Sequence, residues 1–453
     1  MNVEMRRIPM PALDVPVTCP GIAEAEYVTR NRALYDLAEC DWVCIYGDRE
    51  HNANLIFLTG FDPRFEEAML LLGPNDRRLL LVGNEGLVHA SIAGLPLENV
   101  LYQPFSLMAQ PRGDSPPLAE LLTGFGIRKG ASIGIAGWKY FDDGESEVAD
   151  SSRPAYVPAW IASVLDDQTG KPSLDVTSVL MNPVNGLRAV VSADEIARLE
   201  WGASRASAAV LRVLASARPG MTELEAMTAM AYAGEPQSCH PILATSDGVL
   251  NGLRSPGDRV LAEGDAITCG IGYWGGLCCR AGLLSSGDDT FLETTVIPYF
   301  RAIGTWWGTI AVGKSGGEIY SSVIDAIGDA GFGPMLNPGH LTSSDEWLHS
   351  PIDNGSTDSL VSGMVLQCDI IPVPLPPGRA LNCEDTAALA DTELRAEIAN
   401  RHPELWARIE HRRHLLCDLL NIQIADDVLP LSVAPAWLPP FWLAPDLVCT
   451  VAD

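Results

Sequence analysis

Two histidines and two carboxylates in the second half of the chain have the residue types of an acid/base site or a metal site. His340 follows the Gly- and Pro-rich segment 331–339, and His349 comes nine residues later. Asp369 and Glu384 lie in later apolar stretches that predict β-strands. Because imidazole changes protonation near neutral pH, either histidine can donate or accept a proton in catalysis. The sequence therefore predicts a catalytic site made of these four residues.

Bulk composition sets limits on the class of protein that carries this site. A chain of 453 residues predicts two domains. Its 47% apolar and 19% charged residues predict a folded globular protein. The net charge of −28 repels phosphate backbones, so we expect no nucleic-acid partner.

The sequence has no predicted membrane span, no secretory signal pattern and no cysteine motif typical of a metal or redox site. No apolar run is long enough to predict a membrane span, and the N-terminus does not have the pattern of a secretory signal, so we expect a cytoplasmic protein with no membrane partner. The 11 cysteines form no Cys-x-x-Cys pair, and reduced, buried thiols are the expected state.

The first half of the chain predicts a mixed α/β domain. Residues 1–25, with four prolines and little periodicity, predict an arm over the surface; a helix is expected over 24–37 and another from Leu118. Turn-forming segments between 166 and 186 place the domain boundary near 185, which gives domains 1–184 and 185–453. Strands are expected at 42–46, 55–58, 68–72, 79–82 and 132–136.

The second half begins with helices and continues with strands. Capping-box patterns at Ser192 and Thr222 start two helices, the first of them ending near 217. The tail is expected to be helical over 392–420 and irregular over the Pro- and Trp-rich segment 429–453. Strands are expected at 240–244, 265–274, 276–284, 364–371 and 380–388, with helices at about 290–311 and 316–330 between them.

A series of short motifs in the second half resembles the superfamily of aminopeptidase P, creatinase and methionine aminopeptidase. The first half resembles the N-terminal domain of creatinase and aminopeptidase P, with Leu58-Thr-Gly-Phe61 as its best motif. The resemblance implies an α+β fold: a creatinase-like N-terminal α/β domain followed by a pita-bread catalytic domain with a C-terminal extension. The motifs are Gly186-Leu-Arg188, Ser192-Ala-Asp-Glu195, Arg218-Pro-Gly-Met-Thr-Glu223, Ser255-Pro-Gly-Asp258, Pro338-Gly-His340, His349-Ser-Pro351, Gly363-Met-Val365 and Cys383-Glu384-Asp385-Thr386.

The resemblance also implies where metal ligands would stand. Metallopeptidases of this superfamily hold two metal ions with two Asp, one His and two Glu, whose charge activates a water. His340 and Glu384 match two of these positions, and Asp369 matches a third with a shorter side chain. The first Asp position is occupied by Gly270. The second falls at Arg280, give or take one residue, with Cys279 and Ala281 as the alternatives.

These departures lead to the hypothesis of a metal-free site. At about 4 Å and an effective dielectric of 20, two unit charges interact by about 4 kcal/mol, so a guanidinium at this position would repel a divalent ion. We therefore expect Arg280 to fill the metal space and to pair with Asp369 and Glu384, with no metal and no cofactor. The open alternative is a one-residue slip that turns Cys279 toward the cleft. Otherwise strand alternation directs the cysteines Cys269, Cys279, Cys368 and Cys383 away from the site.

Further residues are candidates for substrate binding. Arg280 and Arg254 are expected to bind the substrate. The resemblance implies a histidine before the Ser255-Pro-Gly-Asp258 turn, but this histidine is missing and Asn251-Gly-Leu-Arg254 stands there. His240 is either a pocket wall or a packing residue. Arg64 lies in a charged segment of the first half, which is either a simple turn or a rim that one subunit adds to the other's site in the homodimer that the resemblance implies.

The functional hypothesis is a metal-independent enzyme that uses histidine acid/base chemistry on a small polar molecule, with C–N bond hydrolysis, as in creatinase, as the best class. Three alternatives stay open: a biosynthetic condensation or elimination, a non-catalytic protein that binds a ligand or peptide, and an Xaa-Pro metallopeptidase with altered ligands. Asp369 and Glu384 also have a purely structural alternative, an ion pair with Arg280.

Overall fold

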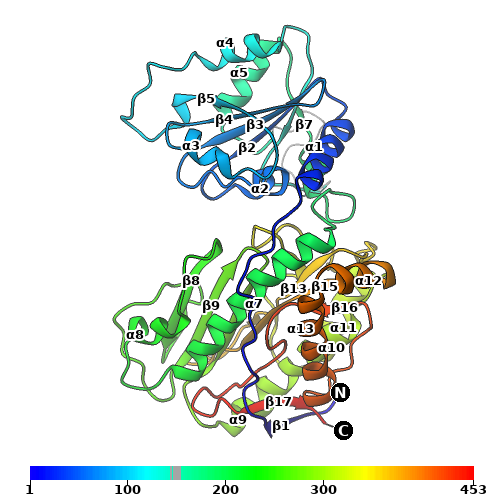
Figure 1. The fold of residues 1–453 in the computed structure, drawn as a ribbon. Helices are drawn as coiled ribbons and strands as arrows, with labels where there is room; N and C mark the ends of the chain where they lie inside the picture. The colour runs from blue at the N-terminus through cyan, green and yellow to red at the C-terminus, as the bar shows by residue number, and fades with distance from the viewer. Residues whose placement is uncertain (143–144, 146–154, 453) are drawn as a thin grey trace. The chain divides into compact units, whose positions relative to one another are not determined.

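The computed structural model describes residues 1–142, 145 and 155–452, which form two compact units (Figure 1). One unit is Ile22–Ala189, and the other joins Met1–Gly21 to Val190–Asp453. Residues 1–21 therefore pack with the C-terminal part of the chain, although the sequence analysis assigned them to the first domain. Strand β1 (Val3–Arg7) explains this, because it pairs antiparallel with β17 (Leu447–Val451) near the C-terminus.

The unit Ile22–Ala189 is built on a mixed sheet with the strand order β5-β4-β3-β2-β6-β7. Alternate residues of β2, Trp42, Cys44 and Tyr46, belong to one core cluster with leucines of α4 and α5. The opposite face of β2 is buried too, and α1 and α2 contact this strand. The strands are β2 (Trp42–Gly47), β3 (Ala68–Gly73), β4 (Arg77–Val82), β5 (Glu98–Leu101), β6 (Ile133–Ala136) and β7 (Leu174–Asp175); the helices are α1 (Glu24–Ala38), α2 (Ala53–Thr59), α3 (Gly86–His89), α4 (Leu118–Phe125), α5 (Ala159–Thr169) and α6 (Thr177–Met181).

One expected strand in this unit is wrong. Residues 55–58 lie in helix α2, which is buried along its whole length and ends at Gly60 with a left-handed φ of 71°. A short apolar run fits a buried helix as well as a buried strand, so hydrophobic pattern alone could not separate the two. The other four expected strands of this unit match β2, β3, β4 and β6.

The C-terminal unit is built on an antiparallel sheet with the order β12-β13-β15-β10-β9-β8, and β16 pairs with β15. Helix α7 lies along this sheet and contacts β9 and β10 (Figure 1). The strands are β8 (Gln237–Ser246), β9 (Ala266–Tyr273), β10 (Gly276–Leu283), β11 (Gly333–Pro334), β12 (His340–Leu341), β13 (Val365–Cys368), β14 (Pro372–Val373), β15 (Asn382–Leu389) and β16 (Val428–Pro430); the helices are α7 (Ala193–Ser216), α8 (Glu223–Met227), α9 (Asp289–Phe291), α10 (Ile297–Thr309), α11 (Gly316–Ile327), α12 (Thr392–Arg401) and α13 (Pro403–His414).

The helix starts that the sequence predicted are present. The hydroxyl of Ser192 accepts a hydrogen bond from the Glu195 amide at 3.2 Å and caps α7. Thr222 and Glu225 form the reciprocal capping box of α8, with bonds of 2.7 and 3.1 Å. Both caps satisfy amides that the first turn of a helix leaves without partners.

The Pro- and Trp-rich tail is an integral part of the core and not a loose extension. Trp437 and Trp442 are both fully buried, and β16 and β17 take the tail into two sheets. Backbone groups of this tail also contact Arg280, as described below. None of the helices over 1–142 and 155–452 is both long and apolar enough to cross a membrane.

Candidate functional site

The register of the β9–β10 hairpin decides which side chains share the site. Cys279 lies opposite Gly270 on β9 and opposite Glu384 on β15, whereas Arg280 lies opposite Cys269 and Cys383. Residues opposite each other in neighbouring strands point to the same face of a sheet. The open alternative of a one-residue slip is therefore the one found: Cys279, and not Arg280, shares the face of Glu384.

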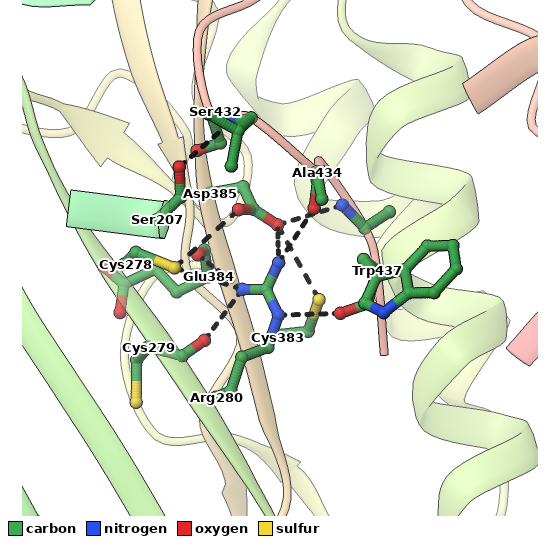
Figure 2. Close-up of polar contacts among 12 residues, drawn as sticks. Ser207, Cys278, Cys279, Arg280, Cys383, Glu384, Asp385, Ser432, Ala434 and Trp437 are labelled. Carbon is green, nitrogen blue, oxygen red and sulfur yellow. Dashed lines mark hydrogen bonds and ion pairs between the residues drawn. The ribbon is translucent and has the colours of Figure 1, made fainter. Parts of the chain in front are cut away.

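The expected role of Arg280 in the site is wrong. Its guanidinium is fully buried and donates to Oδ2 of Asp385 at 2.7 Å, on the opposite face of the sheet from Glu384 (Figure 2). It donates as well to backbone carbonyls of Trp437 at 2.7 Å, Cys279 and Glu384 at 2.9 Å each, and Ala434 at 3.1 Å. Arg280 thus joins β10, β15 and the buried tail, and we assign it a structural role.

His340 is held firmly at the end of its turn. The residue before it, Gly339, has a left-handed φ of 128°, and a Cβ there would come within 2.7 Å of the Gln367 carbonyl oxygen. The His340 ring stacks on Trp347 with 4.0 Å between ring centres, and its Nδ1 lies 3.1 Å from the Leu341 carbonyl oxygen. In the neutral ring this contact favours the tautomer with the proton on Nδ1, in which Nε2 is the acceptor.

A third carboxylate, Glu346, lies beside His340 and was not among the predicted site residues. Its Oε1 is 3.2 Å from His340 Nε2, which is close enough for an ion pair, but the angles between the two groups do not meet hydrogen-bond geometry. The chain between the two histidines folds back on itself through the bonds Leu341 N to His349 O (2.7 Å) and Leu348 N to Leu341 O (2.9 Å). This local closure returns Glu346 to His340.

Asp369 and Glu384 complete the cluster. Asp369 is 5% exposed, and its Oδ1 has no hydrogen-bond partner among the described residues. Burial raises the pKa of Asp369 to about 6, partly opposed by the charge of His340. Glu384 accepts a hydrogen bond from Gln367 Nε2 at 3.0 Å, yet burial and the charges of Asp369 and Glu346 hold its pKa well above the usual range.

The pKa of the His340 imidazole depends on the same burial and neighbouring charges. Burial alone lowers the pKa of His340, but the nearby Glu346 and the charge of Asp369 outweigh this and raise it overall. The structure therefore brings His340, Glu346, Asp369 and Glu384 into one electrostatically coupled group. His349 lies next to it through the backbone of Leu341, is half-buried, and accepts a bond from the Ser350 amide at its Nδ1 (2.9 Å).

Stability should depend on pH through Asp369. Its pKa in the folded chain, about 6, exceeds the ordinary value of 3.8, so its contribution to the unfolding free energy is fully present below about pH 4 and is lost as pH rises through 6. A shift of about two units corresponds to about 3 kcal/mol. Urea unfolding at pH 4.5 and 7.5 in a chelator should show that Asp369→Asn escapes this loss. Equal pH dependence of native and variant would contradict the assignment.

The thiols divide between the two faces of the sheet. Cys269, Cys368 and Cys383 are buried away from the Glu384 face, as strand alternation predicted. Cys279 is on the site face, where its Sγ lies 3.5 Å from the hydroxyl of Thr268 and burial raises its pKa to about 11. It is thus a neutral thiol near neutral pH.

The remaining candidates have different surroundings. Arg64 is exposed in the unit Ile22–Ala189 and lies 3.4 Å from Asp62, so a part in substrate binding stays a prediction. His240 is exposed at an irregularity of β8. Arg254 donates to the fully buried carboxylate of Glu223 at 2.5 Å, and we reassign it to a structural ion pair.

The two-metal site that the superfamily implies does not fit these residues. Gly270 has no side chain to offer, and Cys279 stands at the other Asp position. The Cys279 Sγ lies 3.6 Å from the point that a Cβ on residue 270 would occupy, so a neutral thiol fills part of the space in which an aspartate would reach. Three of the five ligand positions keep a ligand: His340, Asp369 and Glu384.

Comparison with known proteins identifies the fold. No family model and no curated protein matches the sequence. The structure is similar to an Xaa-Pro dipeptidase from Bacillus anthracis, with a TM-score of 0.59 and 18% identity over 82% of this chain and 96% of that one. It is also similar to a prolidase from Thermococcus sibiricus, with a TM-score of 0.65 and 15% identity over 91% and 98%. A prolidase from Pyrococcus horikoshii is similar with a TM-score of 0.62 and 17% identity, over 81% of this chain and 95% of that one. The chain therefore has the α+β pita-bread fold of these peptidase structures, as its motifs predicted.

Proposed function

We propose that this chain is an enzyme that hydrolyses a C–N bond of a small polar molecule in the site of His340, Glu346, Asp369 and Glu384. The observation that carries the proposal is the buried Oδ1 of Asp369, which has no hydrogen-bond partner in the described part of the chain and belongs to a carboxyl group with a pKa of about 6. A base with a pKa close to the working pH combines the correct protonation state with useful proton affinity. The peptidases whose fold the chain shares support this choice of bond class.

In this proposal Asp369 accepts a proton from water as the water oxygen attacks the carbonyl carbon of the substrate. The leaving nitrogen then takes a proton from His349, which is half-buried and so can reach a bound molecule more readily than the fully buried His340. The C–N bond breaks, and a carboxylic acid and an amine are the products. His340 and Glu384 set the charge of the site.

The metal-free form of this hypothesis has lost its main argument. It depended on the Arg280 guanidinium as the cation between Asp369 and Glu384, and that guanidinium pairs with Asp385 on the other face. The negative charge of the cluster must therefore be balanced by protons or by another cation. We propose Asp369 as the base in either case, in place of the histidine base of the original hypothesis.

Amine release from a small panel of compounds tests the function. The panel contains Xaa-Pro dipeptides, other dipeptides, and small ureido and guanidino acids. We expect one class to be hydrolysed and the others to be inert, because a buried polar site rejects molecules that leave its groups unpaired. Compounds that raise the melting temperature without any release of amine would indicate a binding protein and contradict the proposal.

The homodimer remains a proposal that the superfamily resemblance supports. If Arg64 lines the site of a second subunit, Arg64→Ala should raise KM with little change in kcat, since it would remove a contact to the substrate and not to the reacting atoms. Light scattering measures the mass of the assembly, and steady-state kinetics measures the KM. A monomer with unchanged KM in the variant would contradict the dimeric site.

A further inference from the structure

We propose that Glu346, together with His340 and Glu384, binds one divalent cation of the first transition row, such as Zn²⁺ or Mn²⁺. This inference concerns the same site as the proposed function and deepens it. The three side chains each place one ligand atom within 4.8 Å of the other two. Glu346 is not one of the positions that the superfamily motifs match, so the site would be a new arrangement and not a reduced copy of a two-metal centre.

The first argument is the unsatisfied nitrogen of His340. Its Nδ1 contacts the Leu341 carbonyl oxygen, which directs the Nε2 lone pair to the site, and that buried Nε2 has no hydrogen-bond partner in the described ranges. A metal-binding histidine commonly has its second nitrogen held by a carbonyl in this way. Stacking on Trp347 fixes the plane of the ring.

The second argument is the distance between His340 and Glu346. Nε2 and Oε1 lie 3.2 Å apart without hydrogen-bond geometry. At this distance the two atoms need a positive charge between them, which either a proton on Nε2 or a bound cation supplies. Two ligands of one tetrahedral zinc ion, with ordinary bonds of about 2.0–2.2 Å, are about 3.4 Å apart. The observed separation matches two ligands of a shared ion.

The third argument is charge. The carboxylates of Asp369 and Glu384 are 5% and 4% exposed, and Oε1 of Glu346 lies 3.2 Å from Nε2 of the buried His340. A divalent cation would offset this concentration of negative charge, because it stabilises the ionised carboxylates that it contacts. Arg280 is held by Asp385 and cannot serve this purpose.

The donor set suits such an ion. One imidazole nitrogen with carboxylate oxygens is typical of zinc and manganese sites, and three protein ligands with an open position are typical of catalytic zinc. Asp369 is one methylene shorter than the glutamate that the superfamily carries, and it is not among the three residues proposed as ligands. Its carboxylate therefore stays available as the base.

Titration of the chelator-stripped chain with Zn²⁺ and with Mn²⁺ tests the proposal by calorimetry. We expect one ion per chain for at least one metal, with proton release that grows as pH falls, because the ligands must lose protons on binding. The melting temperature should rise on addition of that metal. Glu346→Gln keeps the size of the side chain but should weaken binding at least tenfold. The matched control is Asp353→Asn, which removes the same charge from an exposed carboxylate seven residues later in the chain and should bind as the native chain does.

Three outcomes would overturn the proposal: no saturable binding up to millimolar metal, two ions per chain, or unchanged binding by a folded Glu346→Gln variant. Circular dichroism of each variant in chelator checks that it is folded. The result is separable from the proposed function. Hydrolysis that persists in chelator, with no metal binding, would contradict the cation site and support the proposed enzyme activity. Binding of one ion without hydrolysis of any compound would contradict the enzyme activity and support the cation site.

Discussion

Replacing Arg280 by methionine is expected to destabilise the C-terminal unit by about 3–5 kcal/mol, the usual cost of removing one partner of a buried ion pair. The guanidinium and Asp385 are both essentially inaccessible to solvent. The variant would leave a buried carboxylate with fewer partners and would remove the donors to carbonyls of Trp437, Ala434, Cys279 and Glu384. Urea unfolding followed by tryptophan fluorescence measures the effect.

Two controls define this result. Arg64→Met removes an exposed cation from the other unit and should change stability by no more than about 0.5 kcal/mol. The double variant Arg280→Met, Asp385→Leu should recover much of the loss, because no uncompensated charge is left in the core. If Arg280→Met were as stable as the native chain and instead lost substrate affinity, Arg280 would belong to the site after all.

The contrast between Arg280 and Cys279 shows where prediction from sequence ended. The motifs located both strands of the β9–β10 hairpin, but the face that each side chain occupies depends on the turn. The chain pairs Tyr273 with Gly276 and turns through two residues, which sets the register. A shift of one residue exchanges the faces of a strand, so a one-residue uncertainty moved a buried structural arginine into the predicted site.

Short motifs were more successful where the backbone itself required a residue. Gly339 before His340 and the caps at Ser192 and Thr222 are local features, and the structure has all three. Glu346 could not be found in this way. It stood in the sequence between the two histidines, but only the backbone bonds that close this segment bring its carboxylate to His340.

The burial of the C-terminal tail also could not be predicted from local sequence patterns. Prolines and tryptophans over 429–453 predicted an irregular extension, and the chain is in fact buried there, with Trp437 and Trp442 fully enclosed. Its backbone carbonyls accept hydrogen bonds from Arg280, a residue more than 150 positions earlier in the chain. Such a contact follows from the whole fold, which no segment specifies by itself.

The second large effect is expected in catalysis. Asp369→Asn should reduce kcat/KM by about 10²–10⁴, the usual contribution of a positioned general base. Asparagine has nearly the same shape, so loss of packing is small, and the removal of a buried charge should even stabilise the folded chain above pH 6. Asp353→Asn, with its exposed carboxylate, serves again as the matched control and should keep native activity.

The measurement that tests the central claim most directly is kcat/KM for the hydrolysed compound at pH 7.5, compared between the native chain and Asp369→Asn at equal metal content. Melting temperatures confirm that both chains are folded. A loss of a hundredfold or more, with stability kept or increased, is the result expected if Asp369 is the base of a C–N hydrolase. A variant that retains native kcat/KM within about threefold, well below the usual share of a general base, would contradict the account.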